Sequence, residues 1–127
     1  MDAQELKLGI GAGDLTIDII FGYAQFGSYD VNIYDENGQN GKEIARGSNT
    51  QNRDVEVVSI GPVSDLDGKI IDWDLTISAA ETGPGQFYSA TVIFRQGGTI
   101  VPGGTWQKSG PLQDTKSLYG LFKLVVS

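Results

Sequence analysis

Apolar and polar residues alternate with a period of two along most of this chain. Leu15, Ile17 and Ile19, for example, are separated by Thr16 and Asp18. Because successive side chains of a strand point to opposite sides, this period predicts strands with one buried face. Eight or nine strands are expected, in the segments 6–10, 15–21, 31–34, 42–45, 55–57, 73–78, 87–95 and 118–126, with a short edge strand or ordered loop at 96–108.

Turn-forming residues separate these segments. Eighteen glycines are spread between the apolar runs, and the sequence DENGQNGK after Tyr34 holds two Asn-Gly pairs, which readily take the positive φ angles of a hairpin turn. The segments 6–10 and 15–21 are a second hairpin candidate. No segment combines a helical stripe with helix caps. The chain is therefore predicted to form one domain over 1–127, an all-β antiparallel β-sandwich of jelly-roll or immunoglobulin-like type, with a barrel as the alternative.

Charge and missing residue types exclude several functions. Sixteen acidic and nine basic residues give a net charge of -7, which repels nucleic acid and opposes self-association, so a monomer is favoured over a homo-oligomer. The chain has no cysteine and no histidine. Disulfides, thiolate nucleophiles, Cys/His zinc sites and Ser-His-Asp triads are therefore impossible within it.

The sequence leaves the compartment open. The first thirteen residues, MDAQELKLGIGAG, lack a basic segment followed by a long apolar run, so no signal peptide is expected in this chain. The protein is then either cytoplasmic or secreted with its leader removed. No stretch approaches the about twenty apolar residues of a membrane-spanning helix, so no membrane span is expected.

The stretch DLDGKIIDWDL, residues 65–75, concentrates four carboxylates around one tryptophan. Its alternation places Trp73 in the core and Asp72 and Asp74 on the opposite side, where we expect them to be solvated. Asp65 and Asp67 precede the strand, and an Asp-Gly pair favours a turn there. The less favoured alternative is a calcium site at Asp65 and Asp67, because calcium prefers several converging oxygen ligands.

Four aromatic residues outside the clearest core pattern are the candidate ligand-binding residues. Tyr23, Phe26 and Tyr29 cluster in the glycine-punctuated sequence FGYAQFGSY, and Trp106 follows a Gly-Gly pair. Flat rings on loops stack on sugars or anchor protein partners. The alternative is that these rings close the open ends of the sandwich.

These observations favour a non-enzymatic binding module that recognises a carbohydrate or a protein through its loops. One alternative is a structural or assembly subunit that associates through sheet edges or faces. A weaker alternative is a hydrolase that uses two carboxylates, although the sequence selects no particular pair. No cofactor is expected apart from the possible calcium.

Overall fold

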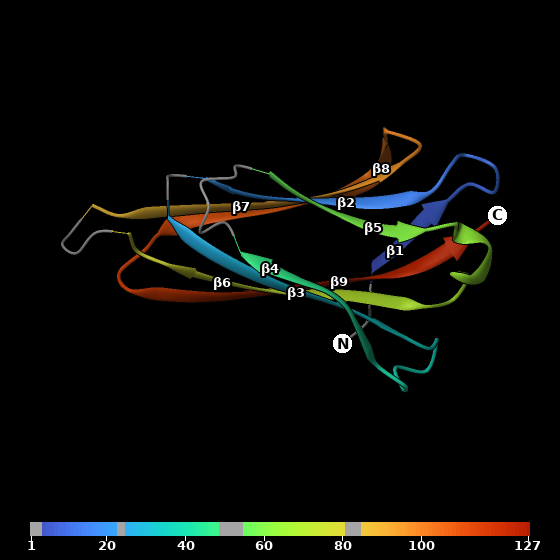
Figure 1. The fold of residues 1–127 in the computed structure, drawn as a ribbon, viewed down its shortest axis with the longest axis horizontal. Helices are drawn as coiled ribbons and strands as arrows, with labels where there is room; N and C mark the ends of the chain where they lie inside the picture. Colours follow the sequence, from blue (N-terminus) through green and yellow to red (C-terminus); the bar gives the residue numbers. More distant parts are fainter. Residues whose placement is uncertain (1–3, 23–24, 49–54, 81–84) are drawn as a thin grey trace.

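Two packed β-sheets make up the computed structural model, which describes residues 4–22, 25–48, 55–80 and 85–127 (Figure 1). Strands account for 71% of the described residues, and the two sheets, of five and four strands, do not close into a barrel. The predicted β-sandwich is therefore confirmed, and the barrel alternative is not the fold. Within the described ranges, no helix is long and apolar enough to cross a membrane.

The described residues form nine strands and one short 3-10 helix, in the following order along the chain. They are β1 (Gln4–Leu8), β2 (Leu15–Gly22), β3 (Phe26–Tyr34), β4 (Lys42–Ser48), β5 (Val55–Gly61), η1 (Val63–Asp65), β6 (Ile70–Ser78), β7 (Phe87–Gln96), β8 (Thr99–Pro111) and β9 (Thr115–Val126). The segment 96–108, expected as a short edge strand or loop, lies mostly in the thirteen-residue strand β8. Its Pro102 is tolerated because β8 is the edge of its sheet.

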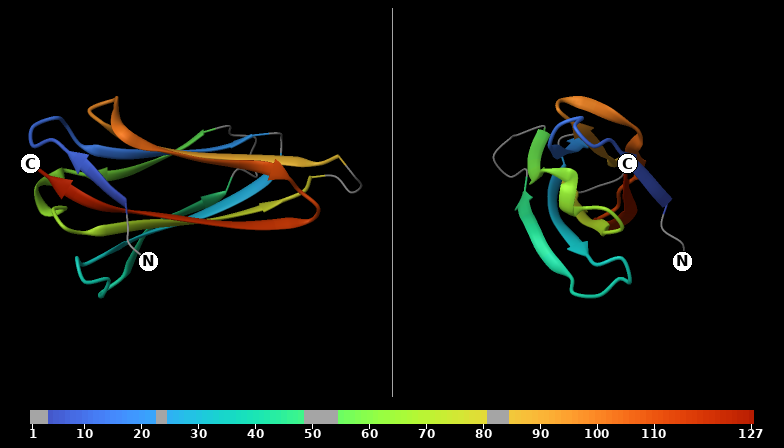
Figure 2. Two further views of the ribbon diagram at one scale, coloured as in Figure 1. Left: turned by 180° about the vertical axis from the view of Figure 1, so that it is seen from behind. Right: turned by 90° about the vertical axis from the view of Figure 1, so that its right-hand side faces the viewer.

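The larger sheet has the strand order β1-β9-β6-β3-β4, and the smaller one has the order β5-β2-β7-β8. Neighbouring strands are antiparallel except β1 and β9, which run parallel at one edge. Figure 2 shows this first strand beside the last. The predicted hairpin between segments 6–10 and 15–21 is wrong, because β1 and β2 belong to different sheets.

The predicted turn between β3 and β4 is confirmed. These two strands pair as an antiparallel hairpin, and Gly38 and Asn40 in the connection both have positive φ angles, of 79° and 56°. Glycine and asparagine are the residues that adopt this backbone conformation at the lowest cost. The local sequence DENGQNGK therefore sets this turn.

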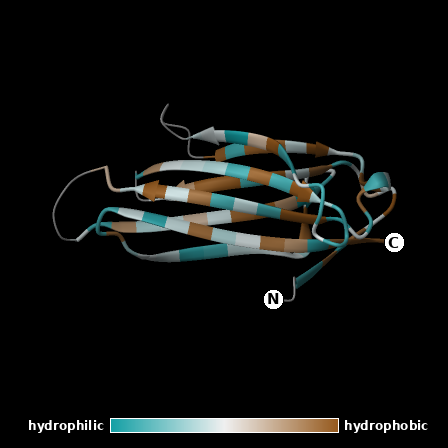
Figure 3. Cartoon of the chain, turned by 90° about the horizontal axis from the view of Figure 1, so that it is seen from below, coloured by the Kyte–Doolittle hydropathy of each residue, from teal (hydrophilic) through white to brown (hydrophobic). Residues whose placement is uncertain are grey.

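A cluster of aromatic rings forms the centre of the core. Trp73 is fully buried, as predicted, and its ring centroid lies 5.4 Å from that of Phe94, 5.6 Å from that of Trp106 and 5.3 Å from that of Phe122. Such tilted and edge-on arrangements stabilise aromatic pairs beyond their burial alone. Along the strands the hydropathy alternates, as Figure 3 shows by colour, so each sheet presents its apolar side to the other. The buried set expected for β7, which is Tyr88, Ala90, Val92 and Phe94, is confirmed.

Candidate ligand-binding face

The four aromatic residues singled out from the sequence have different surroundings. Phe26 begins β3 and is 51% exposed, whereas Tyr29 is buried in the core, so the expectation that Tyr29 is exposed on a loop is wrong. Trp106 lies on β8, half-buried, and its ring packs edge-on against Trp73. Tyr23 lies outside the described residues. The reason for the difference between Phe26 and Tyr29 is strand alternation, which sends residues three positions apart to opposite sides.

Phe26 belongs to the outer face of the five-stranded sheet, which we call the polar face. The outward positions of β3, β4, β6 and β9 align in rows across the sheet, as the strand register requires. One row consists of hydroxyl side chains only, contributed by Ser48, Ser28, Thr76 and Ser117 in that order. Neighbouring strands are about 4.8 Å apart, so this row places four hydroxyl groups, each a donor and an acceptor, over about 14 Å.

A shallow hollow of about 120 Å³ lies at one end of this row. It is lined by Phe26, Gly27, Ser28, Ser48, Thr76 and Ser78. Its walls therefore combine one aromatic ring with hydroxyl groups. The hollow therefore places an apolar surface beside groups that donate and accept hydrogen bonds.

A second exposed aromatic side chain borders the row on its other side. Tyr119 of β9 is 49% exposed and pairs across the sheet with Asp74 of β6, one row beyond the hydroxyl row. Phe26 of β3 lies in the row on the opposite side of the hydroxyl row, where it pairs with Ser78 of β6. Phe26 and Tyr119 are two strands apart across the sheet and four residues apart along the strand direction, which places their positions about 16 Å from each other. The hydroxyl row thus runs between two aromatic surfaces.

A hydrogen-bond network fixes the orientation of Tyr119. Its hydroxyl donates to Asp72 Oδ2 at 3.0 Å, and Asn32 Nδ2 donates to Asp72 Oδ1 at 3.1 Å. Asp72 is only 4% exposed, so the expectation that it is solvated is wrong. It does point away from Trp73, but side chains of the two neighbouring strands cover it. The two hydrogen bonds give both carboxylate oxygens of Asp72 a partner in this buried position.

The same carboxylate alters the ionisation of its neighbours. Burial and the hydrogen bond to Asp72 raise the pKa of Tyr119 to about 12, and burial and the charge of Asp72 also raise the pKa of Tyr34. Burial, followed by the charges of Asp72 and Asp30, raises the pKa of Asp74. Both tyrosines therefore remain hydrogen-bond donors at neutral pH.

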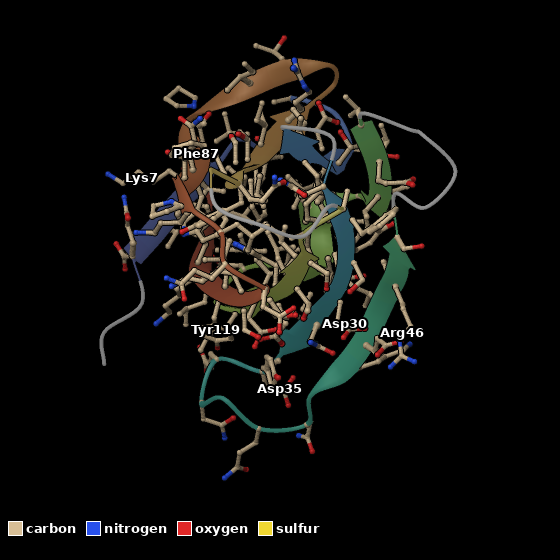
Figure 4. The ribbon with its side chains drawn as sticks, turned by 90° about the vertical axis from the view of Figure 1, so that its left-hand side faces the viewer. Lys7, Asp30, Asp35, Arg46, Phe87 and Tyr119 are labelled. Carbon is tan, nitrogen blue, oxygen red and sulfur yellow. The ribbon has the colours of Figure 1, made fainter. Side chains whose placement is uncertain are left out.

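The basic side chain of Arg46 on this part of the polar face already forms two ion pairs within the face. Arg46 Nε donates to Asp30 Oδ1 at 2.9 Å, and Arg46 Nη2 donates to Glu43 Oε2 at 3.0 Å. In the end-on view of Figure 4, Asp30, Arg46 and Tyr119 lie on the same lower side of the sandwich. Among the outward side chains of β3, β4, β6 and β9 within the described residues, four are acidic and two are basic, namely Asp30, Glu43, Asp72 and Asp74 against Arg46 and Lys123.

The two aspartates proposed for calcium occupy the turn before β6. Asp67 Oδ1 accepts a hydrogen bond from the backbone N–H of Val126 at 2.9 Å, and Gly68 has a φ of +81°, as an Asp-Gly turn requires. Asp65 ends η1 and is exposed. Within the described ranges, no three acidic side chains are grouped as a metal site would require. Calcium binding at Asp65 and Asp67 stays the less favoured alternative.

Sequence reasoning missed Tyr119, Asp72 and the hydroxyl row as parts of a possible site. The available signal was the alternation of Tyr119 with buried residues, but only strand pairing places it near Asp72, 47 residues away. Comparison with known proteins found no match: no family model, no curated protein and no solved structure matches the chain.

Proposed function

We propose that this protein is a non-enzymatic binding module that holds a neutral carbohydrate chain across the polar face. The observation that carries the proposal is the hydroxyl row between two half-exposed aromatic rings, Phe26 and Tyr119. Aromatic rings offer flat apolar surfaces on which a sugar ring can stack. Serine and threonine hydroxyls both donate and accept hydrogen bonds, as sugar hydroxyls do.

The span of the face supports a chain of sugars over a single one. The two rings are about 16 Å apart, which corresponds to a few linked pyranose units. Tyr119 is held in place by Asp72 before any ligand binds, so little conformational entropy is lost when a sugar stacks on it. The ligand would contact the face of a sheet, in place of the loops expected from the sequence.

Charge favours a neutral ligand. The carboxylates around Tyr119 disfavour uronic acids and sulfated sugars. Arg46 on the same face is already paired with Asp30 and Glu43, and Lys123 lies two outward positions from Tyr119 along β9. A protein partner is less favoured, because the centres of protein interfaces are depleted of charged residues and serine, and this face is rich in both.

Binding can be tested with a panel of neutral oligosaccharides and soluble polysaccharides by isothermal titration calorimetry and affinity electrophoresis. Tyr119→Ala and Phe26→Ala should each weaken binding about tenfold or more, because aromatic anchors commonly contribute over 1 kcal/mol. Phe87→Ala is the matched control, since Phe87 is also half-exposed but lies on the outer side of the other sheet. Unchanged affinity in the two variants, or equal loss in the control, would refute the proposal.

The weaker alternative, a hydrolase with two carboxylates, has one supporting observation. Asp72 and Asp74 are alternate residues on one side of β6, about 7 Å apart, and the pKa of Asp74 is raised. Asp72, however, is buried and already accepts two hydrogen bonds. An assay for released reducing ends on the same panel separates the two functions. Activity that disappears in Asp74→Asn would establish the hydrolase.

A further inference from the structure

A cleft of about 360 Å³ lies between β1 and the start of β8, and we call it the β1–β8 cleft. Its walls come from β1, the loop between β1 and β2, the turn after β7 and the first residues of β8. Small-molecule sites usually have volumes of about 300 to 1,000 Å³, so the cleft is large enough for a small ligand. It is distinct from the hollow beside Phe26. Lys7 in its wall pairs with Val125 at the end of β9, whereas Phe26 lies in the row of Thr115, where β9 begins.

The side chain of Gln96 holds the walls of the cleft together. Gln96 is buried, and its Oε1 accepts a hydrogen bond from the backbone N–H of Gly9 at 2.9 Å. Its Nε2 donates to the carbonyl oxygens of Gly9 and Gly13 at 3.0 and 3.2 Å. The N–H of Gly97 also donates to the carbonyl oxygen of Asp14, at 3.1 Å. These bonds join the loop after β1 to the turn after β7, so the cleft is formed before a ligand binds and little conformational entropy is lost on binding.

Two glycines allow the loop and the turn to approach each other closely. A Cβ atom added at Gly13 would stand 2.7 Å from the Cα of Gly97, and one added at Gly97 would stand 2.7 Å from the carbonyl oxygen of Ala12. Both glycines also have positive φ angles, of 106° and 55°. A side chain at either position would therefore push the walls apart as well as strain the backbone.

The lining of the cleft combines apolar surface with one cation. Ala12, Ile100, Val101 and Pro102 supply the apolar part. Lys7 is the one ionisable side chain in the lining, and among the described residues it forms no ion pair. In the same part of the chain β8 pairs only with β7, so alternate backbone N–H and C=O groups on its free edge lack a strand partner beside the cleft.

Lys7 gives the cleft a positive charge although the whole chain carries -7. Figure 4 shows Lys7 on the side of the sandwich opposite Arg46, because β1 and β4 are the two edges of the larger sheet. Glu5, the other charged residue of β1, pairs in register with Lys123. Since the rest of an acidic surface repels anions, an anionic ligand would concentrate at the cleft.

We propose that the β1–β8 cleft binds a small organic anion that carries one acidic head group on an apolar body. The head group pairs with the ammonium of Lys7, and the apolar body lies against Ile100, Val101 and Pro102. An exposed ion pair changes affinity only a few fold, so burial of the apolar body supplies most of the affinity and Lys7 selects the anion. This proposal is independent of the proposed carbohydrate site.

Two fluorescent probes test the proposal on the full chain. Anilinonaphthalene sulfonate has a sulfonate on an apolar aromatic body, and N-phenylnaphthylamine is the same molecule without the sulfonate. Fluorescence titration should show that the sulfonate probe binds about threefold to fivefold more tightly than the neutral probe. Amide NMR spectra recorded during the titration should shift mainly at residues 7–13 and 96–102, which contain the lining.

Variants separate the charge from the apolar contacts. Lys7→Gln should weaken binding of the sulfonate probe about threefold or more and leave the neutral probe unchanged. Lys42→Gln is the matched control, because it removes the same charge from an exposed residue at the opposite edge of the sheet, and it should behave as wild type. Thr99→Trp fills the cleft from an exposed position of β8 and should abolish binding of both probes.

Circular dichroism establishes that each variant is folded, and the NMR map of the wild type stands without any variant. Absence of sulfonate-probe binding up to about 1 mM, or NMR shifts centred elsewhere, would overturn the proposal. So would an equal loss of both probes in Lys7→Gln, or binding that a folded Thr99→Trp variant leaves intact.

Discussion

Gly120 offers the sharpest test of how the core is packed. This residue of β9 is paired directly with Trp73 of β6, and the indole lies over its backbone. A Cβ atom added at Gly120 would stand 2.5 Å from Trp73 Cε2 and 2.6 Å from Trp73 Nε1. Carbon atoms in contact are normally about 3.5 to 4.0 Å apart, so the ring or the strand would have to shift by about 1 Å. We therefore expect Gly120→Ala to destabilise the fold.

The magnitude follows from two opposing effects. Overpacking a core by a methyl group costs about 1 to 3 kcal/mol, and Trp73 has little room to move because three aromatic rings surround it. Replacing glycine by alanine in a strand recovers about 0.5 to 1 kcal/mol of chain entropy. The net loss in the free energy of unfolding should be about 1 to 2 kcal/mol.

Urea unfolding followed by tryptophan fluorescence measures this loss. The midpoint should fall by about 0.5 to 1 M, given the usual urea dependence of small proteins. Gly110→Ala is the matched control, because its added Cβ would meet Tyr88 at an ordinary 3.4 Å, and it should be neutral or stabilising. In a Trp73→Phe background the cost of Gly120→Ala should shrink, since the smaller ring frees space. A Gly120→Ala variant as stable as wild type would refute this account of the core.

Three further predictions concern the carboxylates. Asp72→Ala should destabilise by about 1 to 3 kcal/mol in urea titrations, because it removes the buried carboxylate that accepts hydrogen bonds from Asn32 and Tyr119. Asp74→Ala should stay within about 0.5 kcal/mol, and the reverse order would contradict the network. Tyr119 has a pKa of about 12 in the folded protein against 10.0 in the unfolded chain, so its stabilising contribution is full below pH 10 and is lost as the pH rises through 12. The difference between the ultraviolet titrations of wild type and Tyr119→Phe should show a midpoint near this pKa. Asp72→Asn should lower the pKa of Tyr119. Millimolar calcium should not raise the melting temperature. If calcium did bind, a hundredfold excess over its dissociation constant would add about 2.7 kcal/mol of stability, which is easily detected. A clear rise abolished by Asp65→Asn with Asp67→Asn would therefore establish the calcium site.

Local alternation in the sequence determined which side of each strand is buried. It placed Trp73 in the core and identified the buried side of β7, because a period of two needs no knowledge of which strands are neighbours. The turn between β3 and β4 was equally local, since Gly38 and Asn40 accept positive φ angles on their own. Strand existence and turn chemistry are thus properties of short segments.

Tertiary structure alone decided which strands meet and what each outward side chain touches. Nothing local to Asp72 indicates that Asn32 and Tyr119 will cover it, since these residues are 40 and 47 positions away along the chain. The hairpin expected between the first two strands failed for the same reason, as β1 instead pairs with β9 at the far end of the chain. A strand's own sequence fixes its faces, whereas its partners depend on how all the strands together bury the most apolar surface.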